Sequence, residues 1–448
     1  MNNKIIIIGA GLCGTLLALR LAQRGFYVNV FERRPDMRKA TISAGRSINL
    51  ALSDRGLRGM ELTGIKKDIS NLLIPMNGRM IHQLDGETTF VNYSGRKGEW
   101  INSVSRGELN MLLLNKAEET GKIQFIFNAE CDDVDLASGS IQFINNNNET
   151  SWVESGKVVF GTDGANSALR NAMLRQSSRY RFDFSQKHLE TGYKELQIPA
   201  SESGGYRMEK NALHIWPRHG FMMIALPNLD GSFTVTLFLP FDGNNSFSKL
   251  QTDDQILNFF STNFSSSIGH MPDLLNDFKT NPSSSLATVK CYPWQVDGKY
   301  LLMGDAAHAV VPFYGQGMNA SFEDVVVLDE LIDQFDGDWS RIFPAYQQKR
   351  KTDTDAIADL AEENQYEMRA ATADPVFLFK RKIELQLEQL YPDYYSKYSL
   401  VTFREDIPYS VAMQKGRKQD EILMNYAKEV IESGKVDYQY LSERLTKA

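Results

Sequence analysis

Hydrophobic and polar positions at the start of the chain follow the pattern of a strand, a helix and a second strand. Residues 4–8 include four consecutive isoleucines, which is typical of a strand buried on both faces. Apolar residues then recur with helical spacing up to Gly25, where a glycine ends the predicted helix. A second run rich in β-branched residues ends at Glu32. The pattern predicts a βαβ unit with parallel strands.

The same pattern returns later in the chain. Residues 109–136 predict a helix followed by a strand, and residues 157–174 and 301–332 each predict a strand, a turn and a helix. Residues 79–95 and 213–240 instead hold short strands separated by Pro, Asn, Asp and Gly, which indicates antiparallel hairpins. We therefore predict an α/β protein with three units: a discontinuous Rossmann-like domain with a parallel sheet (1–75, 100–180 and 291–370), an antiparallel-sheet domain (76–99 and 181–290) and a C-terminal helical region (371–448).

Composition and charge exclude several classes of protein. The 448 residues are 42% hydrophobic and 23% charged, as in globular proteins, and the net charge of -7 disfavours binding to nucleic acid or anionic membranes. Three distant cysteines indicate neither a disulfide framework nor a metal cluster, so we expect a cytoplasmic protein without a metal site. No apolar run approaches the ~20 residues that span a bilayer.

The first motif with chemical meaning is Gly9-Ala10-Gly11-Leu12-Cys13-Gly14, directly after the first strand. Gly9 allows the turn, Gly11 allows close approach of a pyrophosphate, and Gly14 allows helix and strand to pack closely. Glu32, at the end of the second strand, is placed to accept hydrogen bonds from ribose hydroxyls. The motif predicts a dinucleotide site and leaves open whether it takes NAD or FAD.

Two further motifs also follow apolar strands. In the first, Asp163 and Gly164 form a turn, and on its own the favoured interpretation is an ordinary strand-to-helix turn capped by Asp163 or Ser167. In the second, Asp305 ends a strand, and the Gly315-Gln316-Gly317-Met318-Asn319 turn begins a helix whose free N–H groups suit a cofactor oxygen. His308 lies between them, and we favour a locally satisfied histidine over a proton-transfer role.

The order and spacing of these three motifs resemble the flavoprotein aromatic hydroxylases of the para-hydroxybenzoate hydroxylase superfamily. That resemblance implies bound FAD held by the first unit, NADPH as cosubstrate, O2, and a substrate domain made from the antiparallel sheet. It further implies that the turn at Asp163 serves both FAD and NADPH, and that Asp305 binds the ribityl chain. The absence of a second glycine-rich βαβ unit fits a family that has no separate nicotinamide domain.

Longer stretches, including GRSINLALSDRG, SVSRGELN, LHIWPR and GDAAHAVVPFYGQGMNASFED, are similar to the members of this superfamily that hydroxylate L-kynurenine. The similarity runs to about residue 403. It implies a role in tryptophan degradation and NAD biosynthesis, in a soluble form, since the chain ends at Ala448 without the hydrophobic anchor of eukaryotic relatives. The cofactor-contacting residues that follow from the motifs and the resemblance are Gly9, Gly11, Cys13, Gly14, Glu32, Arg46, Arg106, Cys131, Asp163, Asp305, Gln316, Gly317, Met318 and Asn319.

The resemblance also implies a clamp for the amino-acid end of the substrate. Arg79 would bind the α-carboxylate with its planar guanidinium, and Tyr93, Asn364 and Tyr398 would add hydrogen bonds. Tyr398 alone could equally be a core aromatic residue. The role of Tyr314 is left open. The expected apolar wall around the aromatic ring is Leu213, Ile224, Leu226, Phe238, Pro312 and Phe313.

The implied reaction is hydroxylation of L-kynurenine to 3-hydroxykynurenine through a flavin hydroperoxide. The aniline nitrogen activates the ring, so we assign no protein acid or base. The alternatives are a sister hydroxylase acting on another aromatic carboxylic acid, a pyridine-nucleotide dehydrogenase, and a flavin-binding protein without hydroxylase activity. The sequence fixes neither the oligomeric state nor the NADPH docking site.

Overall fold

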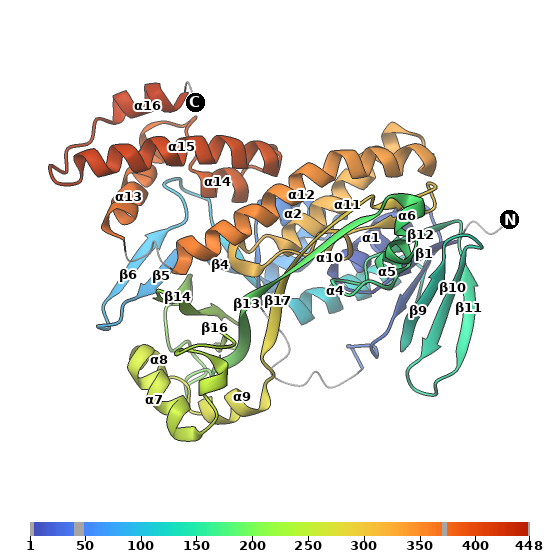
Figure 1. Cartoon of the computed structure of the whole chain (residues 1–448), viewed down its shortest axis with the longest axis horizontal. Coiled ribbons are helices and arrows are strands. Elements are labelled where there is room, and N and C mark those ends of the chain that lie inside the picture. The colour runs from blue at the N-terminus through green and yellow to red at the C-terminus, as the bar shows by residue number, and fades with distance from the viewer. Residues whose placement is uncertain (1–3, 40–48, 370–373, 447–448) are drawn as a thin grey trace.

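A six-stranded sheet forms the core of the nucleotide-binding part of the molecule. The computed structural model describes residues 4–39, 49–369 and 374–446 (Figure 1). Five strands of this sheet are parallel, and β18 is antiparallel at the edge. Their order is β18 (Gln295–Val296), β19 (Tyr300–Leu302), β12 (Val158–Gly161), β1 (Ile5–Ile8), β2 (Val28–Glu32) and β8 (Ile123–Phe127). The predicted parallel sheet is confirmed.

Buried helices explain why the central strands are apolar on both faces. The four isoleucines of β1 are all buried, and α1 (Leu12–Gln23) packs against α4 (Arg106–Glu118) and α11 (Gly317–Gln334). Short helices complete this part of the chain: α2 (Asp54–Leu62), α3 (Lys66–Ile69), α5 (Ala168–Arg175), α6 (Ser177–Tyr180) and α10 (Asp305–His308). The three turns predicted to carry the cofactor motifs therefore leave neighbouring strands of one sheet.

A seven-stranded sheet forms the second layer. Its order is β17 (Ser284–Tyr292), β13 (Asp183–Ile198), β16 (Phe233–Pro240), β15 (Phe221–Pro227), β14 (Ala212–Arg218), β5 (Gly78–His82) and β6 (Thr88–Asn92). The hairpins at 79–95 and 213–240 are confirmed. One pair differs from the antiparallel prediction, because β14 and β5 are parallel and place Leu213 opposite Arg79. These two strands are far apart in the chain, so no hairpin dictates their direction.

Two small sheets and three helices flank these layers. β3 (Asn49–Leu52), β7 (Ile101–Ser105) and β4 (Ile74–Met76) form one sheet, and β9 (Ala129–Asp135), β10 (Ser140–Asn145) and β11 (Ser151–Ser155) form the other. The seven-stranded sheet is covered on one side by three helices at the lower end of Figure 1, which are α7 (Asp253–Asn263), α8 (Ser265–Ile268) and α9 (Leu274–Thr280).

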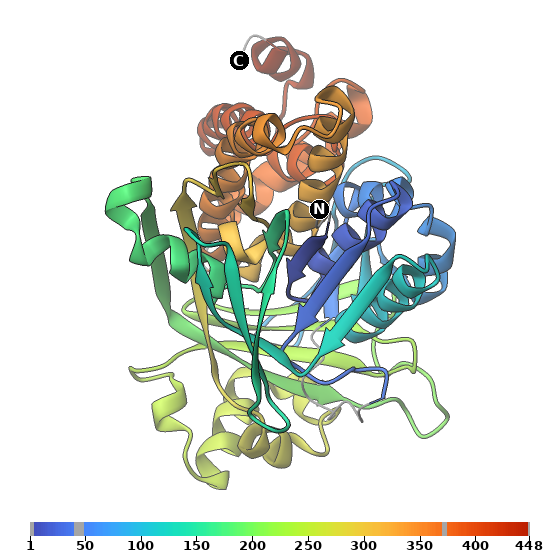
Figure 2. The same ribbon diagram turned by 90° about the vertical axis from the view of Figure 1, so that its right-hand side faces the viewer.

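The C-terminal region predicted over 371–448 is helical, as expected. It comprises α13 (Pro375–Leu390), α14 (Lys397–Thr402), α15 (Tyr409–Val430) and α16 (Tyr438–Thr446), and the long helix α12 (Trp339–Arg369) precedes it. Helix α15 packs against α12, α13 and α14. Figure 1 shows α13, α14, α15 and α16 together at one end of the molecule, whereas α12 runs across it, and Figure 2 shows the same helices from the side. Within the described residues, each helix is too short or too polar to cross a bilayer.

Candidate cofactor and substrate site

The three glycine- and aspartate-containing turns meet at one edge of the six-stranded sheet. Ile8 lies opposite Gly161, and Gly161 lies opposite Leu302, so the carboxyl ends of β1, β12 and β19 are neighbours. The Thr162 hydroxyl donates to the Gly9 carbonyl at 2.9 Å. A Cβ at Gly304 would lie 3.1 Å from the Cys13 Sγ. Segments almost 300 residues apart in the chain therefore form one binding edge, where ligands of open α/β sheets bind.

The three glycines of the first turn have three different environments. Gly9 has a φ of +100°, which favours glycine. A Cβ at Gly14 would collide with the Gly9 carbonyl and the Thr162 hydroxyl, whereas a Cβ at Gly11 would meet nothing within 4 Å. Helix α1 begins at this point without a side-chain cap. Open space beside uncapped N–H groups fits the pyrophosphate of a dinucleotide.

Glu32 at the end of β2 is held ionised beside this turn. Its carboxylate accepts hydrogen bonds from the Ala10 backbone N–H at 2.9 Å and from the Arg34 Nε at 2.7 Å. Burial alone would raise the pKa of Glu32, but the Arg34 guanidinium and the backbone N–H groups outweigh burial and lower it. A carboxylate in this state suits the ribose hydroxyls of a nucleotide.

Asp163 offers one oxygen atom that the protein does not use. Its Oδ2 accepts from the Ala168 backbone N–H at 2.7 Å, while its Oδ1 is buried without a hydrogen-bond partner in the described part of the chain. Burial raises the pKa of Asp163. Cys131 lies on β9, and burial and the Asp163 carboxylate both raise the pKa of its thiol. The unsatisfied oxygen fits a hydroxyl-bearing ligand.

The third turn presents backbone rather than side chains. Asp305 is exposed within an otherwise buried run from 301 to 309. The Asn319 side chain is occupied, because its Nδ2 donates to the Ala51 carbonyl at 2.9 Å and its Oδ1 accepts from the Ser53 N–H at 3.0 Å. Helix α11 begins at Gly317 without a side-chain cap, and Met318 in its first turn is half-buried. Cofactor contacts here would use the backbone N–H groups of this turn.

Of the two expected cofactor arginines, the structure describes only Arg106. Arg46 lies outside the described residues. Arg106 is exposed in the first turn of α4. Its positive charge acts on Glu195: burial raises the pKa of Glu195 to about 7, although the Arg106 charge opposes this shift.

Three of the four expected clamp residues converge, although they come from β5, the turn after β6 and α14. The Arg79 guanidinium lies 5.4 Å from the Tyr93 ring centroid and 5.0 Å from that of Tyr398. The two tyrosine rings stack with centroids 5.2 Å apart, and Tyr314 stacks on the other side of Tyr398 at 5.7 Å. The cluster therefore combines one cation with a pair of phenols.

Two polar atoms in this cluster lack a hydrogen-bond partner in the described part of the chain. The Arg79 Nε and the Tyr93 hydroxyl are buried without hydrogen-bond partners among the described residues. Burial raises the pKa of both Tyr93 and Tyr398, and the Arg79 charge only partly opposes it. Both phenols are therefore neutral hydrogen-bond donors at pH 7. A cation with neutral donors is a site for a carboxylate.

The fourth clamp residue, Asn364 of α12, faces the turn before α11. Its Nδ2 donates to the Phe313 carbonyl at 2.6 Å. Phe313 in turn contacts Phe238, with ring centroids 5.1 Å apart. Leu213 and Ile224 pack against the hydrophobic cluster that contains Phe238 and Phe313, and also against a second one that contains Tyr93 and Leu226. The predicted apolar residues therefore form one continuous wall. Pro312 is exposed beside them.

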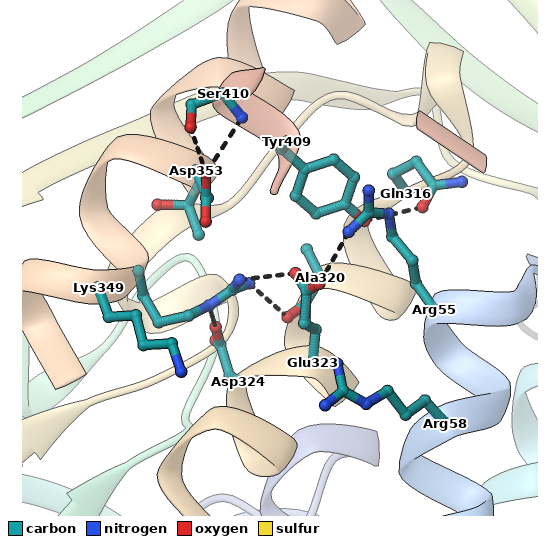
Figure 3. A network of polar contacts seen from close by, with 12 residues as sticks. Arg55, Arg58, Gln316, Ala320, Glu323, Asp324, Lys349, Asp353, Tyr409 and Ser410 are labelled. Carbon is teal, nitrogen blue, oxygen red and sulfur yellow. Dashed lines mark hydrogen bonds and ion pairs between the residues drawn. The ribbon is translucent and has the colours of Figure 1, made fainter. Parts of the chain in front are cut away.

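A buried ionic network underneath the site was not predicted from the sequence (Figure 3). The His308 Nε2 lies 2.6 Å from the Asp324 Oδ2, so His308 is satisfied locally, as favoured above. Asp324 also pairs with Arg350 at 2.7 Å, Arg350 with Glu323 at 2.6 Å, and Glu323 with Arg55 at 2.8 Å. The network fixes α10, α11, α12 and α2 to one another.

Arg55 extends this network to the C-terminal helices. Its Nε donates to the Val401 carbonyl at 2.7 Å, and its guanidinium lies 4.0 Å from the Tyr409 ring centroid. Figure 3 shows Tyr409 reaching from above towards Gln316, on the loop that also carries Pro312 and Phe313. The sequence does not signal these contacts: Arg55 lies in the quoted stretch GRSINLALSDRG without any assigned role, and Tyr409 in α15 has an ordinary helical context.

Comparison with known proteins identifies the family of this chain. Residues 2–361 match the family model described as FAD binding domain. The kynurenine 3-monooxygenase of Myxococcus xanthus is 46% identical over 443 residues, covering 99% of this chain and 94% of the relative. That of Dictyostelium discoideum is 46% identical, covering 96% and 94%, and that of Legionella pneumophila (strain Corby) is 37% identical, covering 99% and 98%.

Solved structures share the fold at low identity. A 2-methyl-3-hydroxypyridine-5-carboxylic acid oxygenase has a TM-score of 0.67 at 19% identity, covering 86% of this chain and 97% of that one. PqsL of P. aeruginosa, in complex with 2-aminobenzoylacetate, has a TM-score of 0.62 at 19% identity, covering 82% and 96%.

Proposed function

Because this chain belongs to the kynurenine 3-monooxygenases, we propose that Arg79, Tyr93 and Tyr398 hold the amino-acid end of L-kynurenine. The protein is a flavin-dependent monooxygenase that converts L-kynurenine to 3-hydroxykynurenine with FAD, NADPH and O2. The observation that supports the clamp is the meeting of an arginine with two neutral phenols, in which the Arg79 Nε and the Tyr93 hydroxyl have no hydrogen-bond partner among the described residues. The α-carboxylate of the substrate supplies the missing acceptor.

Asn364 has a different task within the clamp. Its Nδ2 is already bonded to the Phe313 carbonyl. We assign its Oδ1 to the α-ammonium group of the substrate, because an amide oxygen accepts from a cation. The bond to Phe313 also connects the amino-acid end of the site to the apolar wall that holds the ring.

FAD fits the edge formed by the three turns. Open space at Gly11 would take the pyrophosphate, Glu32 the ribose, and Asp163 and Asp305 the hydroxyls of the ribityl chain. Bound FAD supplies the redox chemistry, accepting a hydride from NADPH and activating O2 for insertion into an aromatic C–H bond. Leu213, Ile224, Phe238 and Phe313 exclude water and orient the ring carbon beside the aniline nitrogen, which activates it without a protein base.

We also propose that the three units predicted from the sequence act as a FAD-binding domain, a substrate-binding sheet and a helical cover, in the cytoplasm. The strands of the seven-stranded sheet come from 78–92 and 183–292, which supports the proposed boundaries. All three cysteines are free thiols, which supports a reducing compartment.

Replacement of Arg79 tests the clamp. We expect Arg79→Met to raise the KM for kynurenine about 100-fold, because a charge-assisted bidentate contact is lost, while FAD content is unchanged. Arg79→Lys should recover only part of the affinity, since an ammonium lacks the fork geometry. Arg58→Met is the matched control, because Arg58 makes a surface ion pair with Glu330. An unchanged KM in Arg79→Met would contradict the clamp.

A further inference from the structure

One buried carboxylate touches the backbone beside both clamp tyrosines. The Glu388 Oε2, on α13, accepts from the Gly95 N–H at 2.8 Å and from the Ser94 hydroxyl at 3.2 Å. Its Oε1 accepts from the Ser396 N–H at 2.9 Å. Gly95 lies two residues after Tyr93, and Ser396 lies two residues before Tyr398. Glu388 is 3% exposed, so both carboxylate oxygens are committed to the protein.

The surrounding contacts hold this carboxylate in place. A Cβ at Gly95 would collide with the Leu385 carbonyl, so the turn after β6 packs directly on α13. The Ser396 hydroxyl caps α14 by accepting from the Ser399 N–H at 3.3 Å. The Arg96 Nη1 lies 3.6 Å from the Glu388 carboxylate, and the Arg96 guanidinium covers the Tyr395 ring at 3.7 Å. The carboxylate is thus buried with a cation at one side.

We propose that Glu388 is a positioning residue that sets the spacing of Tyr93 and Tyr398, and through it the fit of the substrate's amino-acid end. The inference rests on the proposed clamp. The two rings stack at 5.2 Å although their segments are about 300 residues apart and share no strand pairing. Glu388 is a single group bonded to the backbone on both sides of that contact.

The chemistry at this position requires two acceptor oxygens. The segments after Tyr93 and before Tyr398 both present backbone N–H donors to this side chain. A glutamine would keep one acceptor oxygen but would turn its own NH2 group towards one of these backbone N–H groups, so that two donors would face each other. An aspartate would keep the charge but is one methylene shorter, so it cannot reach both segments. Glu388 acts on the substrate through the two tyrosine segments, to which both of its carboxylate oxygens are bonded, so its loss should act on substrate binding and leave the chemical step largely intact.

The test compares two buried glutamates on one helix. In the FAD-loaded enzyme, we expect Glu388→Gln to raise the KM and the Kd for kynurenine about tenfold, with kcat at saturating kynurenine within about twofold and equal flavin content. Glu384→Gln is the control, because Glu384 is as buried as Glu388 and lies one helical turn away from it. Among the described residues, Glu384 forms its ion pairs with Lys380 at 3.1 Å and Arg381 at 2.7 Å rather than with either tyrosine segment. Glu384→Gln should lower the thermal midpoint and leave the KM unchanged.

Further variants separate failure of this inference from failure of the clamp. If Glu388→Gln does not fold, Gly95→Ala disturbs the same contact from the other segment and should raise the KM in the same way. An unchanged KM in a folded, flavin-loaded variant of either kind overturns the inference, whereas an unchanged KM in Arg79→Met overturns the clamp itself. In Arg79→Met the addition of Glu388→Gln should change the KM by less than about twofold, because both act on one binding contact. Full additivity would overturn the coupling.

Discussion

The Tyr409 hydroxyl donates a hydrogen bond of 2.9 Å to the Gln316 Oε1, and both side chains are buried. Tyr409 begins α15, and Gln316 directly precedes α11, whose first N–H groups we assign to the flavin. Helix α15 therefore touches the loop before α11 through a buried polar contact, and the Arg55 guanidinium stacks on the same tyrosine ring (Figure 3). The helical cover and the cofactor edge form one structural unit.

Removal of this contact should lower stability. Tyr409→Phe leaves the Gln316 oxygen buried without its donor, which costs about 1–2 kcal/mol of the free energy of unfolding. Urea denaturation followed by circular dichroism measures the change, and flavin retention on gel filtration shows whether the loop loosens. Tyr440→Phe, at an exposed position on α16, is the control and should change neither. Equal stability of the Tyr409 and Tyr440 variants would contradict a structural role for the bond.

The cofactor edge could be predicted from the sequence because local patterns determine it. Apolar strands followed by glycine turns place Gly9, Asp163 and Asp305 at strand ends, and the right-handed βαβ connection brings parallel strand ends together. The sequence could not show that the Gln316 and Asn319 side chains are occupied within the protein, because their partners Tyr409 and Ala51 come from distant segments.

The substrate clamp was predicted only through the resemblance. Arg79, Tyr93 and Tyr398 lie on three elements whose proximity depends on tertiary packing, which no periodicity encodes. Glu388 was missed for a related reason. A glutamate in an amphipathic helix normally faces solvent, and its burial becomes evident only when the turn after β6 and the start of α14 are placed against it.

The glycine turn predicts two different outcomes for the same substitution. Gly11→Ala should leave the apoprotein folded, because the new Cβ meets no protein atom, and should reduce FAD affinity at least about tenfold, because the Cβ occupies the space assigned to pyrophosphate. Gly14→Ala should instead destabilise the apoprotein, because its Cβ collides with the Gly9 carbonyl. Apoprotein thermal midpoints and FAD titration by fluorescence distinguish the two. Full FAD affinity in Gly11→Ala would show that the pyrophosphate lies elsewhere.

The buried network predicts an acid-dependent loss of stability. Burial alone would raise the pKa of Asp324, but His308 and Arg350 outweigh burial and lower it to about 2. A carboxylic acid whose pKa is lower in the folded than in the unfolded state stabilises the fold at any pH above its unfolded pKa, which is about 4 for an aspartate. For Asp324 this contribution to the free energy of unfolding is about 2 kcal/mol, and it is lost as the pH falls from about 4 through 2.

Asp324→Asn tests this linkage. At pH 7 the variant should be less stable by about 3–5 kcal/mol, because Arg350 and His308 lose a buried partner. Between about pH 4 and pH 2 the stability of the unchanged protein should fall more steeply than that of the variant. Urea unfolding at several pH values measures both effects, with Asp393→Asn at an exposed position as the control. Parallel pH profiles for all three proteins would contradict the assignment.

The clamp makes one prediction in which stability and binding change in opposite directions. The Tyr93 hydroxyl is buried with no hydrogen-bond partner in the described chain, so Tyr93→Phe removes an unsatisfied polar group. The free energy of unfolding of the substrate-free enzyme should rise or stay within about 0.5 kcal/mol, while the Kd for kynurenine should rise about tenfold because the carboxylate loses a donor. Tyr300→Phe is the matched control, because its hydroxyl is also buried and unpartnered but lies on β19, away from the clamp. It should share the effect on stability and leave the Kd unchanged. A Tyr93→Phe enzyme that is less stable and binds kynurenine normally would assign the hydroxyl to the fold and remove it from the clamp.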